Sequence, residues 1–247
     1  MGARLTVADL TVAYDRHPAI HHVGFTAEPG SLTAIIGPNG AGKSTLVKAV
    51  AGFLRPAEGS VEISPSGTRI AYLPQRAEIE RSFPITVRDA VLLGCWRQLG
   101  WFKAAGAADH AAVSVALEAV GLGHFEERPI GTLSVGQFQR MLFARAMLEG
   151  ADLILLDEPF AAVDARTVRD LTQIIRRWQA EGRTVLAVLH DLELVAHAYP
   201  EAILLARRLI AAGPTAAVLD PANLAAARAM AEAWDERAGA CLATAHP

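Results

Sequence analysis

Cysteine and long apolar runs are scarce in this sequence. The chain has only 2 cysteines, Cys95 and Cys241, which lie far apart and match no zinc-binding or redox spacing. No apolar run reaches the roughly 18 residues that a membrane-spanning helix requires. The late candidate, residues 202–212, is interrupted by Arg207 and Arg208. We therefore expect a soluble chain with reduced structural thiols.

An excess of positive charge and a signal-peptide pattern are also missing. The formal net charge is −3 and the isoelectric point is near 6.2, which argues against a protein that coats nucleic acid and predicts no nucleic-acid partner. Residues 1–4 lead into alternating positions rather than an apolar segment, so we expect a cytosolic location. The 247 residues suffice for one domain, or one domain with an inserted lobe, around a large core.

The strongest positive signal is a glycine-rich loop, which reads Gly37-Pro38-Asn39-Gly40-Ala41-Gly42-Lys43-Ser44-Thr45. It matches G-x-x-x-x-G-K-[ST], the phosphate-binding loop. Its glycines let the backbone bend close to an anion and point successive N–H groups inward. Lys43 could reach the β- and γ-phosphates of a nucleotide, and Ser44 could place its hydroxyl on Mg²⁺. An apolar strand at residues 32–36 and a helix from about Lys43 give the motif its expected context.

A second strong signal is a pair of carboxylates at the end of a buried strand. Residues 153–156 are four consecutive aliphatic residues, as a central parallel strand requires, and Asp157 and Glu158 follow them. Open α/β sheets bind ligands at the carboxyl ends of their strands. Asp157 suits Mg²⁺ coordination, and Glu158 could hold a water against a γ-phosphate. Residues 184–189 form a similar strand that ends at His190, which could hydrogen-bond to a γ-phosphate.

Two weaker signals flank these patterns. Alternation over residues 1–30 predicts antiparallel strands on one edge of the domain, with Tyr14 at the end of the second. Tyr14 is either an aromatic platform for adenine or an ordinary strand tyrosine. Gln75 follows a strand at 70–73 and could reach Mg²⁺ or the attacking water, although most loop glutamines are merely solvated.

Residues 77–145 show a helical pattern, which we interpret as a lobe inserted into the α/β core. Its aromatic cluster is either the core of that lobe or part of a partner-binding groove, and it comprises Trp96, Trp101 and Phe102. Ser134 is a good N-cap for a helix that runs to Glu149, and serine and glycine at a helix N-terminus can also form an anion site. The tail from Pro214 is alanine-rich and predicted to be helical.

A histidine cluster near the N-terminus leaves two interpretations open. The cluster comprises His17, His21 and His22. Histidine is the commonest metal ligand, so the cluster could bind a metal. No third-ligand spacing supports such a site, and exposed loop histidines are the alternative.

Taken in order, these segments resemble the ATP-binding subunit of an ABC transporter over residues 4–215. That family has an adenine-stacking aromatic, a Walker A loop, a Q-loop, a signature helix, a Walker B strand, a D-loop and an H-loop. The matching positions are Tyr14, Gly37 to Thr45, Gln75, Leu133 to Gln137, Leu153 to Glu158, Asp164 and His190. The resemblance implies an α/β fold of the P-loop ABC type. It would have a mostly parallel core sheet, an antiparallel β edge subdomain, a helical subdomain at roughly 77–145 and a helical tail at 214–247, in one domain over 1–247.

The resemblance also implies how the residues would bind and hydrolyse ATP with Mg²⁺. Glu158 would orient or deprotonate the attacking water, His190 would hold the γ-phosphate, and Gln75 and Lys43 would complete the catalytic set. Mg²⁺ would be held by Ser44, Gln75 and Asp157. The nucleotide would be contacted by Tyr14, Gly37, Pro38, Asn39, Gly40, Ala41, Gly42, Lys43, Ser44, Thr45, Ser134, Gly136, Gln137 and Asp164.

In the family, two such domains pair head to tail, and each ATP lies between one Walker A loop and the other signature helix. This chain carries one of each motif, so the resemblance implies a homodimer. Val135 departs from the family, because the usual signature is Leu-Ser-Gly-Gly-Gln and Val135 replaces the first of the two glycines. Valine demands ordinary helical or β dihedral angles at this position, and we expect the site to work.

A narrower resemblance, to the zinc/manganese importer branch, lies in residues 72–76, 82–89, 93–94, 99–102 and 157–164. It implies that the ATPase powers import of a divalent transition metal, zinc or manganese. The permease would be a separate transmembrane polypeptide that the helical lobe and the Gln75 loop contact at the cytoplasmic face of the inner membrane. A solute-binding protein would deliver the metal. The alternatives are an importer of iron-siderophore or another small solute, a non-transport ABC ATPase, and a binding module without catalysis.

Overall fold

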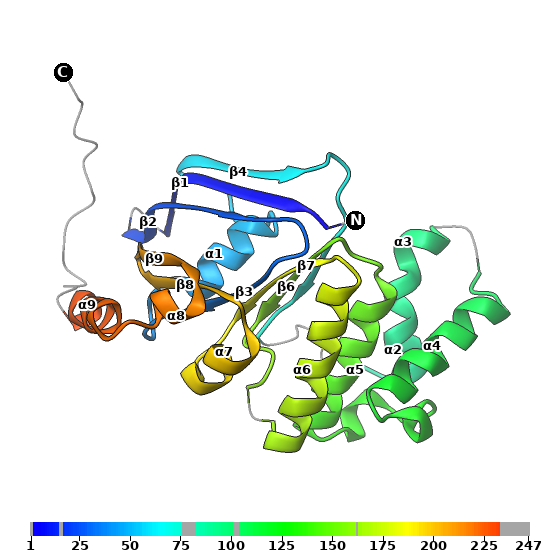
Figure 1. Ribbon diagram of the computed structural model, residues 1–247. Helices are drawn as coiled ribbons and strands as arrows, with labels where there is room; N and C mark the ends of the chain where they lie inside the picture. The colour runs from blue at the N-terminus through cyan, green and yellow to red at the C-terminus, as the bar shows by residue number, and fades with distance from the viewer. Residues whose placement is uncertain (1, 15–16, 76–82, 101–103, 162, 233–247) are drawn as a thin grey trace.

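The structure, a computed structural model, describes residues 2–14, 17–75, 83–100, 104–161 and 163–232. Its first sheet is antiparallel, has the order β2-β1-β4, and lies above the phosphate-loop helix in Figure 1. These strands are β1 (Arg4–Tyr14), β2 (His17–Ala27) and β4 (Glu58–Ser64). The expected antiparallel strands near the N-terminus are therefore confirmed.

The second sheet has six strands in the order β5-β6-β7-β3-β8-β9, and every pairing is parallel except that of the last two. Its strands are β3 (Leu32–Ile36), β5 (Ile70–Leu73), β6 (Leu153–Asp157), β7 (Thr184–Val188), β8 (Glu201–Ala206) and β9 (Arg208–Pro214). Every residue of β3, β6 and β7 is buried, as their aliphatic sequences predict for central parallel strands. The predicted mostly parallel core sheet is confirmed.

Helices cover this sheet and extend beyond its β5 edge (Figure 1). They are α1 (Lys43–Val50), α2 (Val87–Leu92), α3 (Trp96–Leu99), α4 (Ala107–Ala119), α5 (Val135–Leu148), α6 (Ala165–Ala180), α7 (Leu192–Ala198), α8 (Thr215–Val218) and α9 (Pro221–Glu232), with 3₁₀ turns η1 (Leu93–Cys95), η2 (Gly123–Phe125) and η3 (Ile130–Thr132). The helices α2, α4 and α5 contact one another, as expected for a helical lobe whose exact bounds stay a prediction. Among the described residues, no helix is both long and apolar enough to span a membrane.

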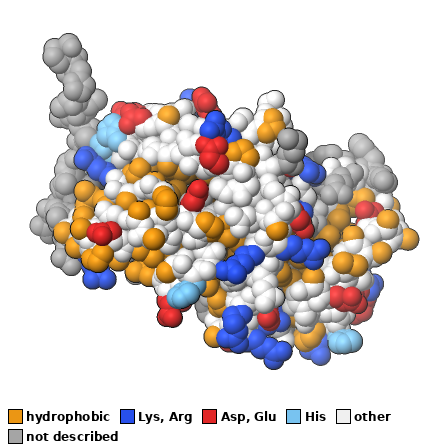
Figure 2. Space-filling view, in the orientation of Figure 1, with side chains coloured by type: hydrophobic (Ala, Val, Ile, Leu, Met, Phe, Trp, Pro, Cys, Tyr) orange, Lys and Arg blue, Asp and Glu red, His pale blue; other side chains and the backbone are white. Residues whose placement is uncertain are grey.

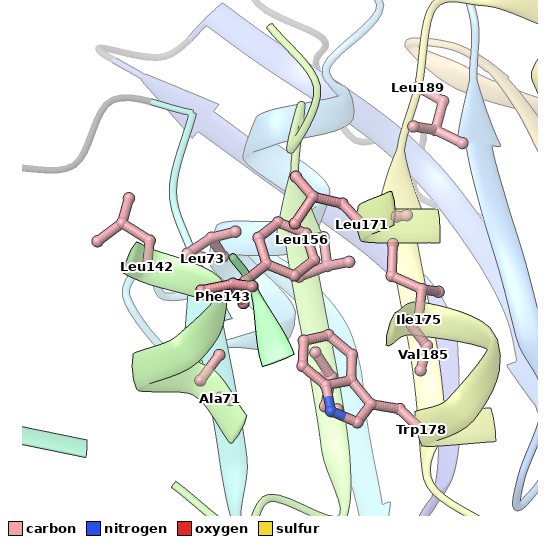
Figure 3. Close-up of a cluster of buried hydrophobic side chains, with 14 of the residues drawn as sticks. Ala71, Leu73, Leu142, Phe143, Leu156, Leu171, Ile175, Trp178, Val185 and Leu189 are labelled. Carbon is pink, nitrogen blue, oxygen red and sulfur yellow. The ribbon is translucent and has the colours of Figure 1, made fainter. Parts of the chain in front are cut away.

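The core that joins helices to sheet is centred on two stacked aromatic rings. In Figure 3 the ring of Phe143 from α5 lies beside the β6 residue Leu156, and the ring of Trp178 from α6 lies further along the sheet. Their ring centroids are 5.6 Å apart and their planes are 5° from parallel. Phe143 is completely buried. The pair therefore fixes α5 and α6 against the strand that carries the acidic residues.

Three expectations about local structure are wrong. Exposed loop histidines were one interpretation of His21 and His22, but both lie within β2, at an irregularity in its pairing with β1, and His21 is only 8% exposed. Proline and glycine in residues 56–60 predict a turn, but residues 58–60 belong to β4, which pairs with β1. The helix α7 was not predicted, although Asp191 caps it by accepting hydrogen bonds from the backbone N–H groups of Glu193 and Leu194.

The surface separates apolar and charged regions. Figure 2 shows hydrophobic side chains gathered where Figure 1 has β9, α8 and α9, and a group of Lys and Arg side chains along the lower edge near α6. Trp96 is 48% exposed, so it does not form the core of the helical lobe. The other members of the predicted aromatic cluster, Trp101 and Phe102, lie outside the described residues.

Replacing Phe143 by alanine tests whether the stacked pair holds the helices on the sheet. We expect Phe143→Ala to lower the free energy of unfolding by about 3–5 kcal/mol, because it removes a fully buried ring and leaves a cavity. Val115→Ala on α4 is the control, since this side chain is 65% exposed and its loss should change stability by about 0.5 kcal/mol or less. Urea unfolding of both variants gives the comparison, and equal losses would contradict the assignment.

Candidate active site

The glycine-rich loop joins β3 to α1, as the sequence predicted. The Lys43 ammonium folds back over the loop and donates to the carbonyl oxygens of Gly37 and Pro38, each at 2.9 Å. Lys43 is only 5% exposed. Burial lowers the pKa of Lys43, while the nearby charges of Glu158 and Asp157 act in the opposite direction. The loop thus holds a desolvated cation that an anionic ligand would stabilise.

Close packing explains why the loop needs glycine at two positions. Gly42 is the N-cap of α1 with φ of 87°, and a Cβ there would lie 2.3 Å from Ile20 Cγ2 and 2.6 Å from the carbonyl oxygen of Ala19. A Cβ at Gly37 would lie 1.9 Å from the carbonyl oxygen of Leu205. The loop is therefore pressed between β2 and the end of β8, and only glycine fits.

Asp157 lies at the carboxyl end of β6, next to the helix that follows the loop. Its Oδ1 accepts a hydrogen bond from the Ser44 hydroxyl at 2.9 Å, and its Oδ2 accepts one from the Tyr72 hydroxyl at 3.4 Å. Burial raises the pKa of Asp157, and the adjacent Glu158 charge adds to this effect. A carboxylate paired with a hydroxyl is an oxygen donor set that fits Mg²⁺. Tyr72 had no predicted role in the site, since it was considered only as part of a strand and of the segment 72–76.

The Glu158 carboxylate is held between the side chains of Gln75 and His190, which the resemblance assigned to the same catalytic set. Gln75 Nε2 donates to Glu158 Oε2 at 2.6 Å, and His190 Nε2 lies 2.6 Å from Glu158 Oε1. The Glu158 side chain is 17% exposed and has a backbone φ of 50°, an uncommon value for a residue other than glycine. The loops after β5, β6 and β7 supply these three groups. A carboxylate oriented from both sides in this way can act as a general base.

A cavity of about 270 Å³ opens above the loop, lined by residues 39–45 together with Ala19, Glu158 and Arg207. Its position between the backbone of the loop and Glu158 suits the phosphates of a nucleotide. The sequence analysis missed Arg207, which it considered only as an interruption of an apolar run. Gly37 and Pro38, the first residues of the predicted loop, do not line this cavity.

Several predicted site residues do not line this cavity. Ser134 and Gln137 cap α5 reciprocally, since the Ser134 Oγ accepts from the Gln137 N–H at 3.2 Å and the Gln137 Oε1 accepts from the Ser134 N–H at 2.9 Å. Asp164 caps α6 by accepting from the Arg166 and Thr167 N–H groups, each at 3.0 Å. Gly136 lies in the first turn of α5, and Tyr14 is a 48% exposed residue at the end of β1.

Val135 takes the first helical position of α5, directly after Ser134, and is 47% exposed. This position has the ordinary helical conformation that a β-branched residue accepts, as expected. The substitution for glycine therefore leaves the N-terminus of the helix intact and adds an exposed apolar side chain beside it.

The histidine cluster does not assemble into a metal site within the described residues, where no group of three or more His, Cys, Asp or Glu side chains is placed to hold an ion. His22 Nδ1 lies 2.6 Å from Asp9 Oδ1, and the rings of His21 and His22 meet edge to face. Burial lowers the pKa of His21.

Comparison with known sequences places these features in context. A sequence model of the family described as ABC transporter matches residues 20–161. The zinc transport system ATP-binding protein TroB of Treponema pallidum is 43% identical over 212 residues, which is 84% of this chain and 80% of the relative. The manganese transport system ATP-binding protein MntB of Halalkalibacterium halodurans is 39% identical over 230 residues, which is 91% of this chain and 92% of the relative.

Solved structures with the same fold include an ABC transporter in an inward-facing conformation that is proposed to be of the metal-chelate type. It has a TM-score of 0.82 and 28% identity, over 92% of this chain and 90% of that chain. The ADP conformation of the ATP-binding cassette MJ1267 has a TM-score of 0.77 and 24% identity, over 93% of this chain and 99% of that chain. The second likeness supports the fold alone.

Alanine substitutions at the two ends of α1 test how tightly the loop is packed. We expect Gly52→Ala to cost about 1–2 kcal/mol of stability, because its φ of 82° is left-handed but nothing lies within 4 Å of the new Cβ. Gly42→Ala should cost more, because the backbone of Ala19 must also move. Thermal and urea unfolding measure the difference. Equal losses for the two variants would show that the packing around Gly42 is looser than described.

Proposed function

The chain belongs to the ABC transporter family, and we propose that it is the ATP-hydrolysing subunit of an importer for a divalent transition metal, zinc or manganese. The proposed ATP hydrolysis rests on the position of Glu158. Gln75 and His190 hold its carboxylate at the edge of the cavity above the glycine-rich loop. The cargo is supported by relatives at about 40% identity, over most of the chain, that are named for zinc or manganese transport.

Each side chain has a defined role in the proposed hydrolysis. The N–H groups of the loop and Lys43 would hold the β- and γ-phosphates of ATP. Glu158 would orient the attacking water and accept its proton, while Gln75 and His190 keep the carboxylate in place. Asp157 and the Ser44 hydroxyl would hold Mg²⁺, which neutralises charge on the phosphates when it is bound.

The position of the signature residues supports a head-to-tail homodimer. Ser134, Gly136 and Gln137 lie at the N-terminus of a 14-residue helix but do not line the phosphate cavity of their own chain. A helix N-terminus stabilises an anion through its N–H groups and dipole. A second copy would bring this terminus to the γ-phosphate, so that each ATP is enclosed by both chains. Val135 would then face the partner.

A groove of about 790 Å³ beside the site is where we place the permease. It is lined by apolar and charged side chains that include Phe53, Tyr72, Gln75, Arg145 and Glu149. Phe53 is 67% exposed, an unusual exposure for an aromatic ring. The groove reaches Ser44 and Asp157, so a permease segment seated there would lie next to the nucleotide site. With a permease seated there, the chain would lie at the cytoplasmic face of the inner membrane, and a solute-binding protein would deliver the metal.

A second cargo is favoured by one specific likeness. The structure with the TM-score of 0.82 is proposed to be of the metal-chelate type, which fits the alternative of an importer for iron-siderophore complexes. The catalytic residues would be the same, because the cargo does not contact this subunit.

The role of Glu158 is tested by Glu158→Gln, which keeps the shape of the side chain but removes the base. We expect steady-state ATPase activity to fall by about 10²–10³-fold, the usual loss for one preorganised group, with ATP binding retained. The control is Glu193→Gln, which changes an exposed carboxylate on α7 outside the site. Phosphate release and equilibrium ATP binding are measured on the purified chains. A Glu158→Gln variant with wild-type turnover would remove Glu158 from this role.

The cargo is tested by the metal content of whole cells grown under metal limitation. We expect zinc or manganese to be depleted in cells that carry Glu158→Gln, compared with wild-type cells, because import requires hydrolysis. Mass spectrometry measures zinc, manganese and iron in parallel. Depletion of iron alone would favour the siderophore alternative, and unchanged metal content with ATPase activity lost would contradict the metal assignment.

A further inference from the structure

Arg207 occupies an unusual backbone position at the turn between β8 and β9. Its φ is 60°, in the left-handed region that residues other than glycine and asparagine rarely adopt. Such a conformation is strained and persists only where surrounding contacts impose it. The turn lies beside β2, whose contacts with β9 bring the hairpin next to the phosphate loop (Figure 1).

The backbone of Arg207 is bound on both sides. Its N–H donates to the carbonyl oxygen of Ala41 in the phosphate loop at 2.9 Å, and its carbonyl oxygen accepts from the N–H of His21 in β2 at 2.7 Å. The preceding carbonyl oxygen of Leu205 lies against Gly37, where a Cβ would come within 1.9 Å. The turn is thus hydrogen-bonded to Ala41 of the phosphate loop, and the end of β8 packs against Gly37 at the start of that loop.

Arg207 is one of the residues that line the cavity, together with Lys43 and Glu158. Its Nη1 donates to the carbonyl oxygen of Pro18 at 3.4 Å, and the next residue, Ala19, also lines the cavity. Among the described residues that line it, Lys43 is the other cation, and burial lowers its pKa. A guanidinium keeps its charge under all ordinary conditions and can bind phosphate oxygens through two N–H groups.

We propose that Arg207 is a nucleotide-binding residue that pairs with the polyphosphate of the bound nucleotide, as a second cation beside Lys43. The left-handed turn and its two backbone bonds hold the main chain of Arg207 beside the cavity, so only its side chain must be ordered when the nucleotide binds. This inference rests on the nucleotide binding proposed above. It assigns to the β8–β9 turn a role that none of the sequence motifs indicates.

The alternative is that Arg207 acts only through its backbone, by supporting the loop. Arg207→Asn separates the two roles, because asparagine tolerates the left-handed conformation and keeps both backbone bonds but carries no charge. Arg207→Lys keeps the charge without the paired N–H groups. Arg208→Asn is the matched control, since Arg208 is the next residue, is exposed, and does not line the cavity.

Equilibrium binding of ADP and of inorganic pyrophosphate, measured by calorimetry in EDTA at low and high salt, tests the inference. We expect Arg207→Asn to weaken both ligands by about tenfold or more, the effect of losing a charged hydrogen bond, with a smaller dependence of affinity on salt. Arg207→Lys should recover part of the loss, and Arg208→Asn should bind like the wild type. Melting temperatures without ligand should be alike in all variants.

Three results would overturn the inference. Affinity of Arg207→Asn within twofold of the wild type would show that the guanidinium does not bind the ligand. Equal weakening by Arg208→Asn would indicate a general charge effect. Loss of ADP binding with unchanged pyrophosphate binding would place Arg207 on the nucleoside rather than the phosphates. A wild-type chain that binds neither ligand would instead contradict the proposed function itself.

Discussion

The site depends on the parallel pairing of three fully buried strands, β6, β7 and β3. Parallel strands end at one edge of a sheet, so the groups that follow them come together without being neighbours in sequence. The register pairs Asp157 with Val188 and Ile35 with Val188, which brings the acidic residues, the loop before Lys43 and the segment before His190 to one edge. Burial on both faces prevents a strand from slipping, because any shift would expose aliphatic side chains.

The electrostatics of the site favour an anionic ligand with a bound cation. Burial lowers the pKa of Lys43 and raises the pKa of Asp157, so each charged form is disfavoured by the loss of water. Phosphate oxygens would stabilise the ammonium, and a divalent cation would stabilise the carboxylate. The ligand and its cation would thereby relieve the desolvation of both groups. The positive charge of Arg207 does not depend on burial in this way, since a guanidinium does not lose its proton.

The parts of the fold and site that could be predicted have strong local patterns. The phosphate loop, the aliphatic strands and the helix after Ser134 follow from residue type and spacing alone. Residues 58–60 and His21 were placed wrongly, because the pairing of β4 and β2 with β1 depends on long-range contacts that composition does not reveal. The helix α7 has only 7 residues, and the capping role of Asp191 was not recognised from the sequence. Tyr72 and Arg207 belong to none of the nucleotide-binding motifs, and only the contacts of Tyr72 with Asp157 and of Arg207 with Ala41 show their place in the site.

By itself, the sequence determined the chemistry: a loop that can hold phosphate, carboxylates at a strand end, and a histidine at the end of the next strand. These depend on side-chain type and on spacing within a few residues, which the chain encodes directly. The tertiary structure alone decided that Gln75 and His190 hold Glu158 from opposite oxygens, and that the β8–β9 turn is bonded to the phosphate loop. Such contacts join segments more than thirty residues apart, and the packing of the sheet, not local preference, sets their distances.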